Sequence, residues 1–167
     1  MPLTSRVQVT LTGTLLSSPD FADVSFPLAL LRAIDFANGA GAGQANFLWA
    51  DQRTIAPSGT DALDLNGGGL VDALGAAVAP ARLRAVLIYA AAGNLNNLTV
   101  LGNAAAVPIL NTVATTHTLT PGGIFLVTRP DATGFVVTAA TGDIIQIVNA
   151  AGVNSVVYDI AIIGSLT

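Results

Sequence analysis

The chain contains no lysine, no glutamate and no cysteine, and it has a single histidine, His117. Six arginines and ten aspartates carry all of its side-chain charge over 167 residues, which gives a net charge of −4. Without these residue types the chain has no Schiff-base amine, no thiolate nucleophile and no glutamate base, so only His117 can carry a proton near neutral pH. Most of the usual catalytic designs are thereby excluded, and we expect a protein that is not an enzyme.

The chain also has little charge of either sign. Charged residues make up 10% and hydrophobic residues 52%, whereas charged residues are about a quarter of an average globular protein. A surface with so few charges is poorly solvated, so we expect other subunits to cover part of it. The arginines are scattered, which argues against nucleic-acid binding.

No segment of the sequence predicts membrane insertion. The most hydrophobic stretch, 73–92, is interrupted by Pro80, Arg82 and Arg84, so it cannot span a bilayer. The start of the chain alternates in polarity instead of forming the apolar core of a signal peptide. We therefore expect a soluble protein from an intracellular or viral source, with neither a membrane nor a nucleic acid as partner.

No spacing of residues predicts a cofactor or metal site. One histidine and no cysteine cannot form a zinc cluster, and Asp61 and Asp64 point to opposite faces of a strand, which disfavours a shared calcium ion. The glycines at 39, 41 and 43 miss the dinucleotide-binding spacing at Gln44. We expect no cofactor, and we expect His117 to be an exposed or structural strand residue.

Strand-like segments alternate with turn sequences along the whole chain. Residues 6–15 (RVQVTLTGTL) alternate apolar and polar side chains, which predicts a half-buried strand. Further strands are predicted at 46–54, 60–65, 82–89, 98–101, 115–119, 124–128, 135–138, 143–149 and 155–163. This pattern predicts an all-β fold, a β-sandwich or jelly roll with an extended N-terminal segment. Residues 21–36 fit either a strand or a short helix around 28–34, and 70–75 suggest one helical turn.

The glycine-rich segment 38–44 (NGAGAGQ) divides the chain. We predict an N-terminal strand or arm segment at 1–37, a hinge at 38–44 and a β-sandwich body at 45–167, or one domain on which the arm packs. Strand 7–15 is suited to pairing with a neighbouring subunit. Trp49 suits an interface or the core equally well. The candidate interface residues are Arg6, Val7, Val9, Leu11, Trp49 and Arg53.

Several segments resemble virion proteins of tailed bacteriophages, in a pattern of Asn-Gly-x-Gly, Gln-Ala-Asp/Asn, Asp-x-Arg-Thr-Leu/Ile, Leu-Asp-Leu and Leu-x-Asp-Ala. The resemblance covers roughly 38–164. It is carried by NGAGAGQANFLWADQRTIAPSGTDALDLNGGGLVDALG, AAAGNLNNLTV, LTPGGIFLVTRPDATGF, TGDIIQIVNA and VVYDIAIIG.

What the resemblance implies is a capsid cement or decoration protein on the outer capsid surface, made in the bacterial host cytoplasm. Its expected partners are the major capsid protein and further copies of itself, with a trimer preferred to a dimer. Two alternatives stay open: a tail- or baseplate-associated structural protein, and a carbohydrate- or receptor-binding β-module that uses Trp49.

Overall fold

The computed structural model describes residues 2–17, 23–110 and 114–167, and every regular element in these residues is a β-strand. The N-terminal part forms β1 (Ser5–Ser17), β2 (Val24–Asn38) and the short β3 (Gln44–Ala45). The rest contains β4 (Phe47–Ile55), β5 (Thr60–Asp64), β6 (Arg82–Ala90), β7 (Leu98–Leu101), β8 (Thr116–Leu119), β9 (Ile124–Thr128), β10 (Phe135–Val136), β11 (Ile144–Val148) and β12 (Val156–Ser165). The predicted all-β class is confirmed.

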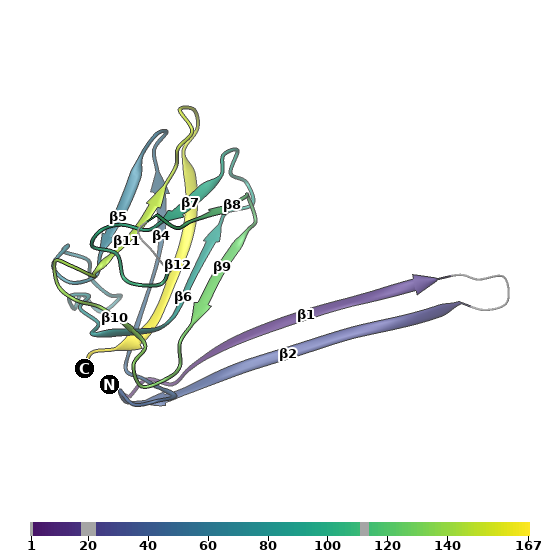
Figure 1. The fold of residues 1–167 in the computed structure, drawn as a ribbon, viewed down its shortest axis with the longest axis horizontal. Coiled ribbons are helices and arrows are strands. Elements are labelled where there is room, and N and C mark those ends of the chain that lie inside the picture. Colours follow the sequence, from purple (N-terminus) through teal and green to yellow (C-terminus); the bar gives the residue numbers. More distant parts are fainter. Residues whose placement is uncertain (1, 18–22, 111–113) are drawn as a thin grey trace.

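Strands β4 to β12 form a sandwich of two antiparallel sheets (Figure 1). One, which we call the β12 sheet, has the order β9-β6-β12-β4, with β10 following β9 along the same edge of β6. The other, the β11 sheet, has the order β5-β11-β7-β8. Strand β4 pairs with β12, β5 with β11, β6 with β9 and β7 with β8. This nested pairing is that of a jelly roll, a long hairpin rolled into two layers.

The core lies between the two sheets, because alternate side chains of each strand point inward. The β12 sheet contributes Val86, Ile88, Tyr158, Ile160 and Ile162, and the β11 sheet contributes Leu63, Leu98, Val100, Ile145 and Ile147. These β-branched and leucine side chains are the ones that fill a pleated surface best. The body therefore has a continuous apolar core of its own.

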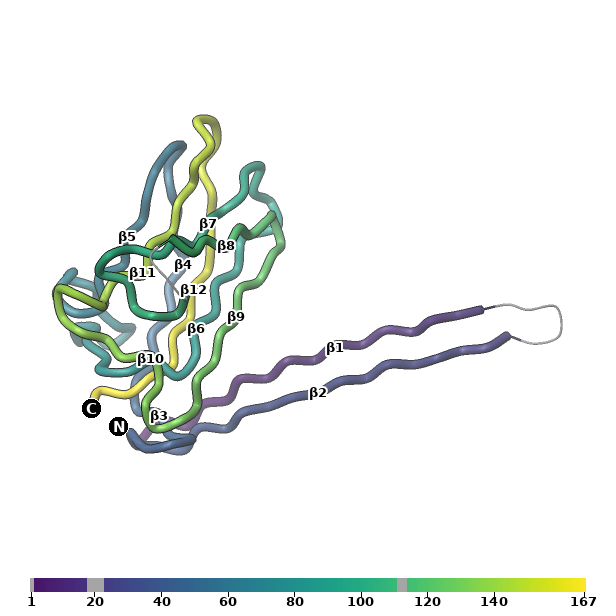
Figure 2. The backbone as a smooth tube through the Cα atoms, viewed as in Figure 1, coloured from purple at the N-terminus to yellow at the C-terminus, as the bar shows by residue number. Residues whose placement is uncertain are grey.

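A long hairpin of β1 and β2, which we call the arm, leaves one end of the body and runs away from it (Figure 1). The ladder is unbroken from Ser5, opposite Phe36, to Ser17, opposite Val24. Residues 24–36 are thus a strand, and the alternative of a helix at 28–34 is wrong. Both chain ends lie near the base of the arm (Figure 2).

The predicted helical turn at 70–75 is also wrong. One carboxylate oxygen of Asp72 accepts the N–H groups of Leu74 and Ala76, each at 2.9 Å, and Val71 forms an isolated bridge with Ala77. An aspartate that accepts nearby backbone N–H groups stabilises a turn in competition with a helix. The predicted turn at Pro19-Asp20 lies outside the described residues.

Candidate interface surfaces

The register of the arm gives it two chemically different faces, because directly opposed residues of an antiparallel pair share a face. The face that we call the apolar arm face carries Val7, Val9, Leu11, Leu15, Val24, Phe26, Leu28, Leu30, Ile34 and Phe36, with Arg32 as its one charged residue. The opposite face, which we call the polar arm face, carries Gln8, Thr10, Thr12 and Thr14 and an ion pair between Arg6 and Asp35 at 3.3 Å, together with the two exposed leucines Leu16 and Leu31. The arm is therefore an amphipathic two-stranded ribbon.

Most of the apolar arm face is exposed to solvent. At the base, Phe36 is buried and Val7 and Ile34 are half-buried. Farther out the exposure rises, to 72% for Leu15 and 68% for Phe26. An isolated two-stranded hairpin is marginally stable in water, and contiguous apolar patches of this kind mark sites of contact. The arm lacks the second layer that would cover it.

The outer surface of the β12 sheet is also apolar. Most of its outward side chains are apolar, and these form what we call the apolar sheet face: Leu48, Ala50, Leu87, Tyr89, Ile124, Leu126, Val157, Ala161 and Ile163, with the polar Gln52, Thr54 and Thr128 at its margins. Asp159 is the one charged side chain that β12 directs outward among them. The outer surface of the β11 sheet is more polar, with Thr60, Asp64, Thr99, Thr116, Thr118 and Gln146. The two faces of the sandwich therefore suit different surroundings.

The two apolar faces meet at the base of the arm. A groove of about 200 Å³ lies there, lined by arm residues Val7, Val9, Arg32 and Ile34 and by Leu126 and Thr128 of β9. From this groove the arm runs away from β9, so the two faces diverge as the walls of an open corner (Figure 1). One chain thus presents two uncovered apolar β-surfaces, which contact each other only at the base of the arm.

Arg84 holds the glycine-rich segment against the body at this junction. Its fully buried guanidinium donates to the carbonyl oxygens of Asp131 and Ala40, the latter at 2.6 Å. The Gly43 N–H donates to the Pro130 carbonyl at 2.8 Å. Burial lowers the pKa of Arg84, and the nearby charge of Arg82 lowers it further. These bonds hold the base of the arm against the body. The role of 38–44 as a hinge stays a prediction.

The candidate interface residues lie in the arm, in the core and at the side of the sandwich. Val7, Val9 and Leu11 lie on the apolar arm face, and Arg6 lies on the polar arm face. Trp49 is 4% exposed, and its indole N–H donates to the Val71 carbonyl at 3.1 Å, so it belongs to the core and not to the surface. Arg53 lies at the side of the sandwich, in a polar network.

That network joins the two sheets. Arg53 of β4 contacts Asp61 of β5 at 2.6 Å and Asp51 at 3.0 Å, and the Tyr158 hydroxyl donates to Asp61 at 2.9 Å. The hydrogen bond to Asp61 raises the pKa of Arg53, while burial and the adjacent Asp61 charge raise the pKa of Tyr158. Because every charge here has its partner within the chain, we assign the network to stability.

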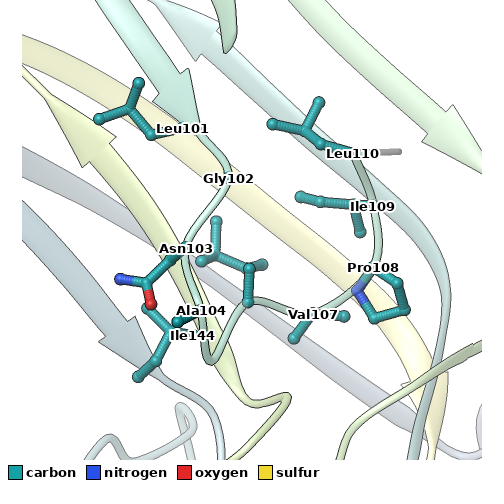
Figure 3. A pocket seen from close by; sticks show the side chains of 11 residues that line it. Leu101, Gly102, Asn103, Ala104, Val107, Pro108, Ile109, Leu110 and Ile144 are labelled. Carbon is teal, nitrogen blue, oxygen red and sulfur yellow. The ribbon is translucent and has the colours of Figure 1, made fainter. Parts of the chain in front are cut away.

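A pocket beside β7 and β11 and the single histidine, His117, are two further candidate sites. The pocket in Figure 3 has a volume of about 160 Å³ and is lined by apolar side chains and Asn103, with no titratable group among them. His117 is exposed on β8, with its ring centroid 5.2 Å from that of Phe125. Within the described ranges there is no group of three metal-ligating residues.

Comparisons with family models, with curated proteins and with solved structures found no match to this chain. In the part of the chain that the structure describes, no helix is long and apolar enough to cross a membrane. The structural features that bear on function are therefore the two apolar faces.

Proposed function

We propose that this chain is a non-enzymatic structural protein of a bacteriophage particle, a capsid cement protein that binds as an oligomer to the major capsid protein and stabilises the head. The observation that carries the proposal is the arm: a ribbon with one apolar face, projecting from a jelly-roll body that has a second apolar face of its own. Large exposed apolar surfaces mark sites of interaction, and permanent contacts with other proteins of an assembly would cover both of them.

The composition supports this role. An arm with leucines and a phenylalanine exposed to water favours association, and a net charge of only −4 offers little repulsion between copies. Neighbouring proteins that cover the apolar arm face and the apolar sheet face would remove their side chains from water. A cement protein makes such permanent contacts across the joints of a shell.

The sequence resemblance supports a bacteriophage particle as the setting. Jelly rolls occur in viral capsid proteins and in lectins, and a fold alone does not decide between such functions. The resemblance of residues 38–164 to tailed-phage virion proteins favours the viral role. A tail or baseplate location is the close alternative, because the same surfaces would serve there.

Carbohydrate binding through Trp49 has less support. A sugar-stacking aromatic ring must be presented at the surface, whereas the Trp49 indole is buried and hydrogen-bonded to Val71.

A binding experiment with phage heads tests the proposal. The purified full-length chain is added to heads that lack it, and heads already carrying it serve as the control. We expect saturable co-sedimentation with the deficient heads, in many copies per head, together with greater resistance of those heads to heat. Failure to bind deficient heads, or binding only to isolated tails, would contradict the cement role.

A further inference from the structure

We propose that the arm of one copy packs its apolar face on the apolar sheet face of a second copy of this chain, so that the protein assembles by arm exchange. The inference rests on the proposed function in that both require protein to cover the arm. It specifies which surfaces join the copies of the oligomer, which the proposed function leaves open, and it can be tested without any particle.

The two faces fit each other in chemistry and in size. Both are surfaces of antiparallel β-structure, and such surfaces pack face to face at about 10 Å. The exposed part of the arm, from Val9 opposite Arg32 to Ser17 opposite Val24, is about 30 Å long at 3.3 Å per residue. Strand β12, with 10 residues, has a similar length of about 33 Å. An arm laid along β12 would extend over the full length of that strand.

The covering arm must come from another copy. Within one chain the two faces touch only at the base groove, and the arm then runs away from β9 (Figure 1). Arg84 and the Gly43–Pro130 hydrogen bond hold the start of the arm in that direction. The structure therefore fixes the base of the arm in a position from which the arm does not cover its own sheet. A neighbour's arm can enter the open corner without that change, as in other exchanges of an element between identical subunits.

The charges of the two faces are complementary. Arg32, the one cation of the apolar arm face, donates to the Leu31 carbonyl at 2.8 Å and has no ion pair among the described residues. On the apolar sheet face, Asp159 accepts a hydrogen bond from the neutral side-chain amide of Gln52 at 2.8 Å. An intermolecular Arg32–Asp159 pair would satisfy both charges and fix the position of the arm.

The area involved is enough for a specific complex. An exposed arm face about 30 Å long and about 10 Å wide covers about 300 Å². Each docked arm buries its own face and the matching sheet face, so two reciprocal arms bury about 1,200 Å², the lower end for stable interfaces. In a trimer, each chain would give one arm and receive one.

Cysteine cross-linking tests the arrangement. Because the natural chain has no cysteine, only the introduced cysteines can form disulfides. Chains carrying Leu11→Cys, Leu28→Cys or Leu30→Cys are each co-expressed with differently tagged chains carrying Ala161→Cys, and the mixture is oxidised. We expect a disulfide between the two kinds of chain for at least one arm position. Thr12→Cys, on the polar arm face and one strand position from Leu11, is the matched control and should not cross-link.

Charge reversal tests the ion pair. Arg32→Asp and Asp159→Arg should each weaken self-association at least tenfold, as measured by sedimentation or light scattering. The double variant should recover most of the association. Arg6→Asp, on the polar arm face, should leave association unchanged. Far-ultraviolet circular dichroism checks that each variant keeps its β-structure.

The outcomes separate this inference from the proposed function. A wild-type chain that stays monomeric at tens of micromolar overturns arm exchange, whatever it does with heads. Equal cross-linking from Thr12→Cys and from the apolar arm positions overturns it too. Oligomers with the expected cross-links support arm exchange even if they do not bind heads, in which case the proposed function alone fails.

Discussion

Arg84 is a fully buried cation whose side-chain hydrogen bonds all go to backbone carbonyl oxygens. It lies in β6 at the point where the pairing with β12 shifts register, so its side chain leaves the regular alternation and reaches the glycine-rich segment. The guanidinium is planar and carries several donors, which suits it to bridging loops in this way. Arg84 thus connects the body to the base of the arm.

Replacing Arg84 by methionine should lower the free energy of unfolding by about 3 kcal/mol, because buried carbonyl groups lose charged donors. Arg82→Met is the matched control. Arg82 donates one exposed hydrogen bond, to the Thr133 carbonyl at 3.1 Å, and its loss should cost about 0.5–1 kcal/mol. Urea denaturation monitored by circular dichroism measures both. Equal costs for the two variants would contradict the role assigned to Arg84.

Tyr158 makes stability depend on alkaline pH. Burial, together with Asp61, raises its pKa in the folded state, so folding favours the neutral phenol. The sign follows from linkage: the contribution is complete below the unfolded pKa of about 10 and is lost as the pH rises above it. The free energy of unfolding should therefore fall by up to about 1.4 kcal/mol per pH unit beyond about pH 10.

In the Tyr158→Phe variant this alkaline decline should be weaker, because phenylalanine has no proton to lose. Urea midpoints of wild type and variant at several alkaline pH values give the comparison. The same slope for both proteins would show that Tyr158 does not cause the decline.

At the scale of strands, the bulge between β6 and β12 depends on a glycine. A β-carbon on Gly164 would lie 2.3 Å from the Arg82 carbonyl oxygen, closer than any side chain can approach. Gly13 in the arm has no atom within 4 Å of the same position. The structure thus needs glycine at one of these strand positions and tolerates alanine at the other.

Gly164→Ala should destabilise the protein by about 3 kcal/mol, because the two strands must move apart to admit the methyl group. Gly13→Ala should leave stability unchanged or slightly increased. Thermal denaturation of both variants measures the difference. A Gly164→Ala protein with the same melting temperature as the wild type would contradict the close approach of β12 to β6.

The body strands could be predicted closely from the sequence. Alternation and turn residues place β7 and β9 at the observed residues and most other strands within one or two. Strand β2 stayed undecided, because alanines, Leu31 and Pro27 occupy the positions between its apolar residues and mask the period of two. Which strands pair could not be predicted, since β4 and β12 lie at opposite ends of the body sequence.

At the scale of the whole molecule, the sequence indicates a surface that other subunits cover but does not locate all of it. Val7, Val9 and Leu11 were predicted as interface residues from their alternation, and the structure places them on one face. The apolar sheet face was missed, because 82–89 and 155–163 are apolar on both sides of the strand and suggest complete burial. The Arg84 contacts and the Tyr158–Asp61 hydrogen bond also join residues that are distant in the sequence.

The location of the protein in the intact particle tests the central claim most directly. A small tag on Thr167, which is exposed at the end of the chain, can be labelled and imaged by electron microscopy. The account predicts label spread over the head in many copies. Label confined to the tail would contradict the cement role and favour the tail alternative, and particles without label would contradict the claim that this is a virion protein.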